Sequence, residues 1–256
     1  MRNALTIARR EIGAALASPV AYVLFGAFAF LYGYFFADYL QSFVEAGMRM
    51  SQMGGFSGGT LNVNTDLLRW LMASTAILVL FLLPLLSMRT VSEEIRSGTM
   101  ELLLTAPITD GQIVIGKFLA AFALYGGMLA LTGLHVGVLF WFSQPEIAPL
   151  LAAYLGLLLL GAGLLALGLF FSSLTRNQIV AGLLTFGALL VLWLVEFAGA
   201  RGGELGRLLA YLSVTGHMEG FARGVIATRD LVFYLSFAAF WLYLARESVR
   251  SRRWRG

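Results

Sequence analysis

The sequence predicts an all-α polytopic membrane protein with six transmembrane helices, and three observations support this class. Hydrophobic residues make up 59% of the chain and charged residues 12%, against about 25% charged residues in an ordinary globular domain. A hydrocarbon core of about 30 Å needs roughly 20 apolar helical residues to cross it, and lipid offers backbone groups no hydrogen-bond partners except those within a helix or a closed barrel. Six long stretches carry no charged side chain: Ile12–Ala37, Trp70–Met88, Phe118–Pro145, Ile147–Thr175, Asn177–Val195 and Leu231–Ala245.

Five of these stretches reach the required length within a residue or so, and the sixth has 15 residues. We therefore expect one transmembrane domain over residues 1–256. Its spans are expected at about 20–37, 70–88, 118–142, 147–171, 178–195 and 230–245, with 89–117 as the longest loop on its side of the membrane.

An amphipathic helix is expected before the first span. Leu5, Ala8 and Ile12 recur at helical spacing, and Arg9 and Arg10 fall towards the other side, a pattern typical of a helix that lies in the membrane interface. The alternative is an ordinary basic flank. The dipeptide at 18–19, Ser-Pro, is expected to end the helix before the chain enters the membrane.

The basic residues predict the orientation. If the spans alternate, the chain ends and the loops on their side carry twelve Lys and Arg residues and the opposite side carries six. Basic residues concentrate in cytoplasmic loops, so both termini are expected in the cytoplasm. The formal net charge of +4 then reflects topology and contact with the lipid bilayer, and nucleic acid is not expected as a partner.

Two of the loops on the opposite side carry recognisable patterns. The loop 38–69 contains the glycine-rich run Gly54–Gly59 without hydrophobic periodicity, so a flexible connection is expected. The loop 196–230 contains Leu205, Leu208 and Leu212 at helical spacing, which predicts a short helix dipping into the outer leaflet.

The connection 89–117 carries a short charged helix in its first half. Polar residues surround an apolar face made by Val91, Ile95 and Leu102, Gly98 interrupts the helix, and Thr109 with Gln112 forms a capping box that starts the next one. Such a helix could dock a cytosolic partner, or it could be a solvated linker stabilised by local ion pairs. The charged residues that bear on this choice are Glu93, Glu94, Arg96 and Glu101.

Other motifs give weaker signals. Residues 111–117 fit the first seven positions of a phosphate-binding loop, but Phe118 replaces the required Ser or Thr, so Lys117 is interpreted as a charge that flanks a span. His135 is the one ionisable side chain inside a span. It is a functional candidate by default, but the favoured explanation is a neutral histidine hydrogen-bonded to a neighbouring helix. No catalytic motif and no metal site are expected.

The segment Ser92–Pro107 resembles the signature loop of type-2 ABC permeases, most closely the gliding-motility permease subfamily, and His217–Ile226 resembles the segment before that subfamily's last span. The resemblance implies a permease subunit, an exporter, in the bacterial inner (plasma) membrane. It also implies a separate cytosolic ATPase that uses the ATP, and pairing with a second permease copy or a paralogue. The chain itself would be no enzyme and would hold no cofactor. The same resemblance implies ATPase coupling by Glu93, Glu94, Arg96, Gly98, Thr99 and Glu101.

One alternative function stays open from the sequence. An ATPase-coupled membrane scaffold, or a mechanotransducing subunit that acts on envelope proteins, would use the same loop without transporting a substrate. An intramembrane enzyme is disfavoured because its motifs are missing.

Overall fold

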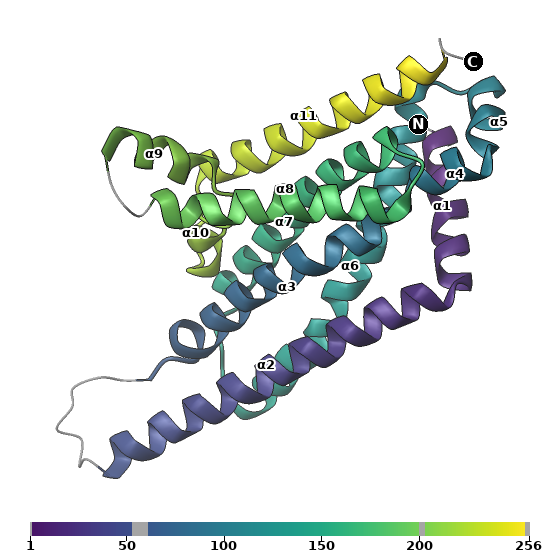
Figure 1. Cartoon of the computed structure of the whole chain (residues 1–256). Helices are drawn as coiled ribbons and strands as arrows, with labels where there is room; N and C mark the ends of the chain where they lie inside the picture. Colours follow the sequence, from purple (N-terminus) through teal and green to yellow (C-terminus); the bar gives the residue numbers. More distant parts are fainter. Residues whose placement is uncertain (1, 53–60, 200–202, 254–256) are drawn as a thin grey trace.

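The structure, a computed structural model, describes residues 2–52, 61–199 and 203–253, and all regular structure within them is helical. Figure 1 shows a bundle of long helices with short helices at both ends. The elements are α1 (Arg2–Ala17), α2 (Pro19–Gln52), a π-helical turn η1 (Val63–Leu68), α3 (Arg69–Ser87), α4 (Ser92–Ser97), α5 (Thr99–Thr105), α6 (Asp110–Phe142), α7 (Ile147–Leu174), α8 (Gln178–Gly199), α9 (Gly203–Leu212), α10 (Met218–Ala222) and α11 (Thr228–Arg253).

Five helical runs among the described residues are long and apolar enough to cross a membrane: Pro19–Gln52, Val63–Ser97, Asp110–Phe142, Ile147–Leu174 and Gln178–Phe197. The chain is therefore a multi-pass membrane protein. In the second run the charge-free part ends at Met88, and a turn separates it from α4, so α4 lies outside the spanning segment. The expected sixth span lies in α11, which is not among the five.

Helix α7 forms the centre of the bundle and packs against α3, α6, α8, α10 and α11. Its glycines allow this: a Cβ at Gly161 would clash with the ring of Tyr125, and one at Gly168 would clash with the hydroxyl of Ser87. By contrast, no described atom lies within 4 Å of a Cβ added at Gly133 or Gly137. Those two glycines therefore make no close contact within the described part of the chain.

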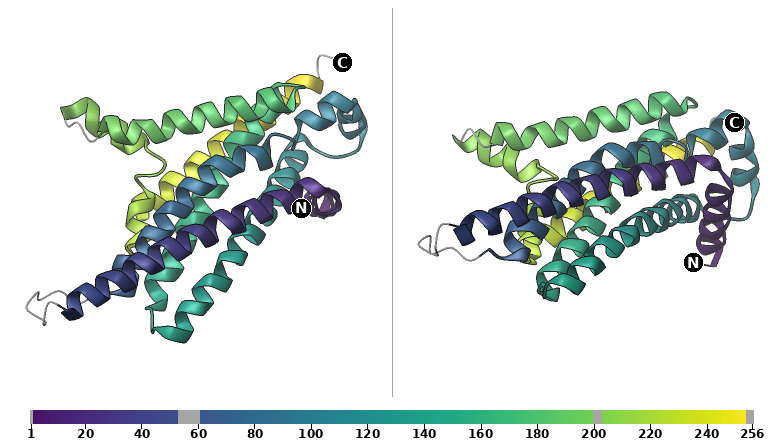
Figure 2. Two further views of the ribbon diagram at one scale, coloured as in Figure 1. Left: turned by 60° about the horizontal axis from the view of Figure 1, so that its bottom comes forward. Right: turned by 90° about the horizontal axis from the view of Figure 1, so that it is seen from below.

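Helix α1 ends at Ala17 and Pro19 begins α2, as expected. Figure 2 shows α1 turned across the end of α2, and it packs along α6. A Cβ at Gly116 of α6 would lie 2.8 Å from Ile7, so glycine is needed there for close approach. The buried face differs from the predicted one, because Leu5 is 61% exposed. The face against α6 consists of Ala4, Ile7 and Ala8.

Helix α2 runs 15 residues beyond the predicted end of the span at 37, so residues 38–52 are helical where part of a flexible connection was expected. Its buried stripe ends at Phe36. Beyond it, side-chain pairs one helical turn apart support the exposed helix: Gln41 donates to Glu45 at 3.0 Å, and Arg49 pairs with the same carboxylate at 3.3 Å. The glycine-rich run Gly54–Gly59 lies outside the described residues.

His135 of α6 packs between aromatic rings of α2. Its ring centroid lies 5.2 Å from that of Tyr32 and 5.3 Å from that of Phe36, both edge-on. Its Nδ1 atom is buried without a hydrogen-bond partner in the described part of the chain. The expected hydrogen bond to a neighbouring helix is therefore absent there, and aromatic contact takes its place.

Candidate functional site

Helices α4 and α5 project beyond the end of the bundle, close to α1 and to the C-terminal end of α11 (Figure 1). Gly98 separates them in the left-handed conformation, with φ of 76°, which a residue with a Cβ adopts only at a cost. The predicted interruption of the helix at Gly98 is confirmed. The segment therefore consists of two short helices, α4 and α5, that meet at Gly98.

A serine of α7 fixes the start of α4. The hydroxyl of Ser172 accepts the backbone N–H groups of Val91 at 3.1 Å and Ser92 at 3.0 Å, and it donates to the carbonyl of Met88 at 2.9 Å. No side chain of α4 itself caps this end. Because unsatisfied N–H groups at a buried helix start are costly, Ser172 ties the first turn of α4 to the central helix.

An apolar cluster lies beneath the two short helices. Val91 and Met100 are buried there, and Ile95 packs against the cluster. The side chain of Leu102, expected on the same face, lies outside the described side chains. The remaining buried members come from three long helices, so the underside of α4 and α5 rests on the bundle: Val114, Leu169, Ala245 and Val249.

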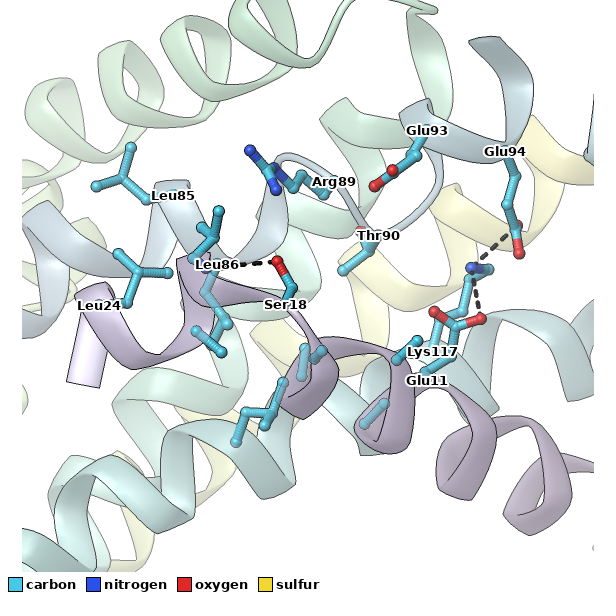
Figure 3. Close-up of a pocket in the computed structure, with 17 residues that line it drawn as sticks. Glu11, Ser18, Leu24, Leu85, Leu86, Arg89, Thr90, Glu93, Glu94 and Lys117 are labelled. Atoms are coloured by element: carbon cyan, nitrogen blue, oxygen red, sulfur yellow. Dashed lines mark hydrogen bonds and ion pairs between the residues drawn. The ribbon is translucent and has the colours of Figure 1, made fainter. Parts of the chain in front are cut away.

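The predicted coupling residues divide into two groups. Glu93, Arg96, Gly98, Thr99 and Glu101 are exposed. Glu94 is not, because its side chain is only 14% exposed and turns towards α6 (Figure 3). Helical geometry explains the split, since Glu94 shares its face with the buried start of α4. The sequence pattern groups Glu94 with the polar residues around the apolar face, but in the structure its side chain is largely buried.

Glu94 belongs to a cluster that we call the four-charge cluster: Arg10, Glu11, Glu94 and Lys117. Lys117 of α6 is only 2% exposed, and its Nζ lies 2.9 Å from Glu94 Oε2 and 3.4 Å from Glu11 Oε1. Arg10 Nη2 lies 3.2 Å from Glu94 Oε1 and 2.8 Å from Glu11 Oε1. Two cations and two anions thus join α1, α4 and α6.

Burial and charge act in opposite directions on Glu94. Burial disfavours the carboxylate and raises the pKa of Glu94, while Lys117 and Arg10 lower it; burial is the larger influence, so the pKa lies above its ordinary value. Hydrogen bonding to Glu11 raises the pKa of Arg10. Ionising the Glu94 side chain in this site therefore costs more free energy than ionising it in water.

Lys117 was interpreted from the sequence as a flanking charge, and the structure corrects this. Helix α6 runs without a break from Asp110, after the predicted capping box of Thr109 and Gln112, so residues 111–117 form no phosphate-binding loop. Position 117 lies on the face of α6 that α1 and α4 cover. The lysine is consequently a buried ion-pair partner.

A cavity of about 300 Å³ adjoins the four-charge cluster (Figure 3). Its walls come from α1, the start of α2, the end of α3, the turn into α4, and α6. It has an apolar part lined by residues such as Leu24, Leu85 and Leu86, and a polar part. The charged residues of the polar part are Glu11, Arg89, Glu93, Glu94 and Lys117.

A second buried polar pair lies at the opposite end of the bundle, beside α10. His217 Nδ1 lies 2.6 Å from Asp230 Oδ1, and His217 Nε2 lies 3.0 Å from the carbonyl of Tyr211. The imidazole stacks on Phe233 with ring centroids 3.9 Å apart, and the side chains of His217 and Asp230 are at most 5% exposed. The predicted short helix before it is present as α9.

Sequence reasoning missed three contributors to the site. Ser172 and Glu11 are ordinary residues at a span end and in a basic segment, and nothing local marks their partners. Lys117 gave a usable signal: it follows the helix start by two turns, on the side that carries Ile113 and Val114. A basic residue on an apolar helix face generally has a partner when buried.

Residues 5–244 match a family model described as ABC-2 family transporter protein. No curated protein matches the chain. The matched range includes α4, α5, the four-charge cluster and all five candidate spans.

Proposed function

Because this chain belongs to the ABC-2 transporter family and is thus a permease component of an ABC transporter, we propose that it forms the membrane path of an exporter driven by a separate cytosolic ATPase. Within the type-2 permeases, we assign the chain to the gliding-motility permease subfamily, as the resemblance of its signature loop implies. The chain hydrolyses nothing in this proposal, and the ATP is used by the partner.

One observation carries the proposal: the row of exposed polar residues on α4 and α5. Glu93, Arg96, Thr99 and Glu101 face solvent, whereas the opposite side of the same helices is anchored in the bundle by Val91 and Met100. Isolated surface charges contribute little to folding. Helices that are anchored on one side and carry exposed charges on the other are suited to recognising a partner by electrostatic complementarity.

The contacts of α4 would transmit a displacement of this helix to other helices of the bundle. Ser172 links α4 to α7, Glu94 links it through Lys117 to α6, and Arg10 links it to α1. When the ATPase moves α4, these three contacts carry the displacement into three helices at once. Arg96, Thr99 and Glu101 would therefore bind the partner, and Glu94 would transmit its movement.

The remaining topology follows the sequence-based expectation. We propose that α11 completes a set of six spans and that both termini lie in the cytoplasm of a bacterium, beneath its inner membrane. A second copy or a paralogue would pair with this chain. Apolar residues on α2 and α8 support pairing or lipid contact, since Phe30 is 75% and Leu183 is 65% exposed.

The decisive experiment reverses two exposed charges, with Arg96→Glu combined with Glu101→Lys. We expect the variant to accumulate and to unfold at the wild-type temperature, because neither side chain is buried. It should lose the ATP-hydrolysing subunit on purification in mild detergent, since misplaced like charges in an interface can cost several kcal/mol. The measurements are the stoichiometry of the purified complex and its ATPase activity.

The matched control reverses the exposed pair at the far end of α2, with Glu45→Arg combined with Arg49→Glu. This control should retain the ATPase. A stoichiometric ATPase and full activity in the Arg96 and Glu101 variant would contradict the docking role. Efflux from reconstituted vesicles distinguishes an exporter from a non-transporting scaffold, because only the exporter moves a substrate.

A further inference from the structure

The cavity beside the four-charge cluster is lined by two charged side chains that do not belong to that cluster. Three of its five charged lining residues, Glu11, Glu94 and Lys117, belong to that cluster. With Arg10 the cluster contains two cations and two anions and is neutral within itself. The charges left over in the cavity are therefore one cation, Arg89, and one anion, Glu93.

Within the described part of the chain, neither of these two side chains forms an ion pair. No ion pair within 4.0 Å is found there for Arg89 or Glu93, although both line the same cavity. The Nε atom of Arg89 is buried and has no hydrogen-bond partner among the described residues. A buried donor without a partner costs free energy, so this cavity favours a ligand that supplies an acceptor.

We propose that this cavity binds the headgroup of an amine-bearing phospholipid, such as phosphatidylethanolamine. Its phosphate would accept hydrogen bonds from the guanidinium of Arg89, which suits phosphate oxygens in a fork. Its ammonium group would donate to the carboxylate of Glu93. Figure 3 shows both side chains on one wall of the cavity, above the turn at Ser18.

The shape of the cavity agrees with a lipid. Its apolar part is lined by Leu24, Leu85 and Leu86, and Leu85 is 42% exposed at the surface of the bundle, so acyl chains could leave along these residues towards the bilayer. A volume of about 300 Å³ lies at the lower end of ligand pockets. It suits a headgroup with its glycerol and not a whole lipid.

The charges favour a zwitterion over an anion. A lipid with a phosphate and no amine would bring an uncompensated negative charge next to Glu93, with Glu11 and Glu94 nearby. A choline headgroup carries the same charges as ethanolamine but has no N–H group to donate. Phosphatidylethanolamine is thus the best match, phosphatidylcholine is weaker, and phosphatidylglycerol is weakest. This inference does not depend on the direction of transport or on the ATPase.

The test measures lipid bound to the full-length chain in detergent. Delipidated protein is titrated with phosphatidylethanolamine, phosphatidylcholine and phosphatidylglycerol, and bound lipid is counted by native mass spectrometry. Soluble phosphoethanolamine is added in a separate arm, because it has the same charged groups without acyl chains. We expect one phosphatidylethanolamine per chain, and affinity at least about tenfold lower in Glu93→Gln and in Arg89→Gln.

The controls are Arg96→Gln and Glu101→Gln, which lie on the same segment but outside the cavity and should bind as the wild type does. Unfolding temperatures without lipid establish that Glu93→Gln, an exposed substitution, is folded. Equal binding of phosphatidylglycerol, equal binding by Glu93→Gln, or saturation by phosphoethanolamine with no gain from acyl chains would each overturn the proposal.

Discussion

The four-charge cluster and the His217–Asp230 pair bury charged side chains at opposite ends of one bundle, yet they connect the chain differently. Arg10 and Glu94 are 84 residues apart, and Glu11 and Lys117 are 106 apart. His217 and Asp230 are separated by 13 residues. One group joins distant segments, whereas the other closes a local turn between α9 and α11.

Burial differs as well. Both members of the local pair are at most 5% exposed and an aromatic ring covers the imidazole. In the four-charge cluster, Lys117 is 2% exposed, but Glu11 is 26% and Arg10 is 59% exposed. A cavity lies beside the four-charge cluster and leaves room for rearrangement. We therefore call the fully buried His217–Asp230 pair the clasp. We call the four-charge cluster the joint, because the cavity beside it leaves room for movement.

The largest expected effect comes from removing the buried cation of the joint. Lys117→Met keeps an unbranched side chain that is one atom shorter, but it leaves Glu94 and Glu11 without their nearest shared counter-charge. Breaking a buried ion pair by removing one partner typically costs about 3–5 kcal/mol. We expect a lower unfolding temperature in detergent and, because α4 loses its link to α6, weaker binding of the ATPase.

Two further variants sharpen this result. Arg10→Gln removes the exposed cation of the same cluster and should cost at most about 1 kcal/mol, as exposed pairs do. Adding Glu94→Gln to Lys117→Met should recover part of the loss, since it removes the unpaired carboxylate. If Lys117→Met costs no more than Arg10→Gln, the buried cation is not a structural joint.

A smaller effect is expected at the clasp. Asp230→Ala leaves the buried Nδ1 atom of His217 without its carboxylate partner, a loss of about 2 kcal/mol for a hydrogen bond that involves a charged group. The unfolding temperature should fall while ATPase binding stays at the wild-type level. Loss of ATPase binding at unchanged stability would show that the two ends of the bundle are coupled.

The parts of the fold that could be predicted from the sequence are those determined by local signals within one segment. Charge-free stretches located the long apolar helices, Pro19 marked the start of α2, and the pair Thr109 and Gln112 capped α6. The left-handed conformation of Gly98 also follows from a local rule, since helices commonly end at glycine.

The sequence did not predict contacts between distant segments. Ser172 caps α4 from another helix, and Glu11 meets Lys117 across 106 residues; neither pairing leaves a periodic trace. The end of α2 was misplaced because charge marks where a membrane ends and not where a helix ends. Glu94 was placed among solvent-facing charges because the pattern shows which residues share a face but not what covers that face.

The smallest effect expected concerns the protonation of Glu94, because it leaves every side chain in place. Burial raises the pKa of Glu94, so the folded protein keeps this proton at pH values at which the unfolded chain has released it. Proton binding by the folded state adds stability. That contribution is complete below the ordinary value of about 4.5 and is lost as the pH rises through the folded value.

The measurement compares the wild type with Glu94→Gln, which has a neutral side chain of the same shape, so that all other titrating groups cancel. The free energy of unfolding of the wild type, minus that of Glu94→Gln, should decrease as the pH rises from about 4 towards neutrality. A difference that increases over this range would mean that Lys117 and Arg10 outweigh burial at Glu94. Burial would then not be the larger influence on Glu94, and the four-charge cluster would be a net-favourable set of ion pairs.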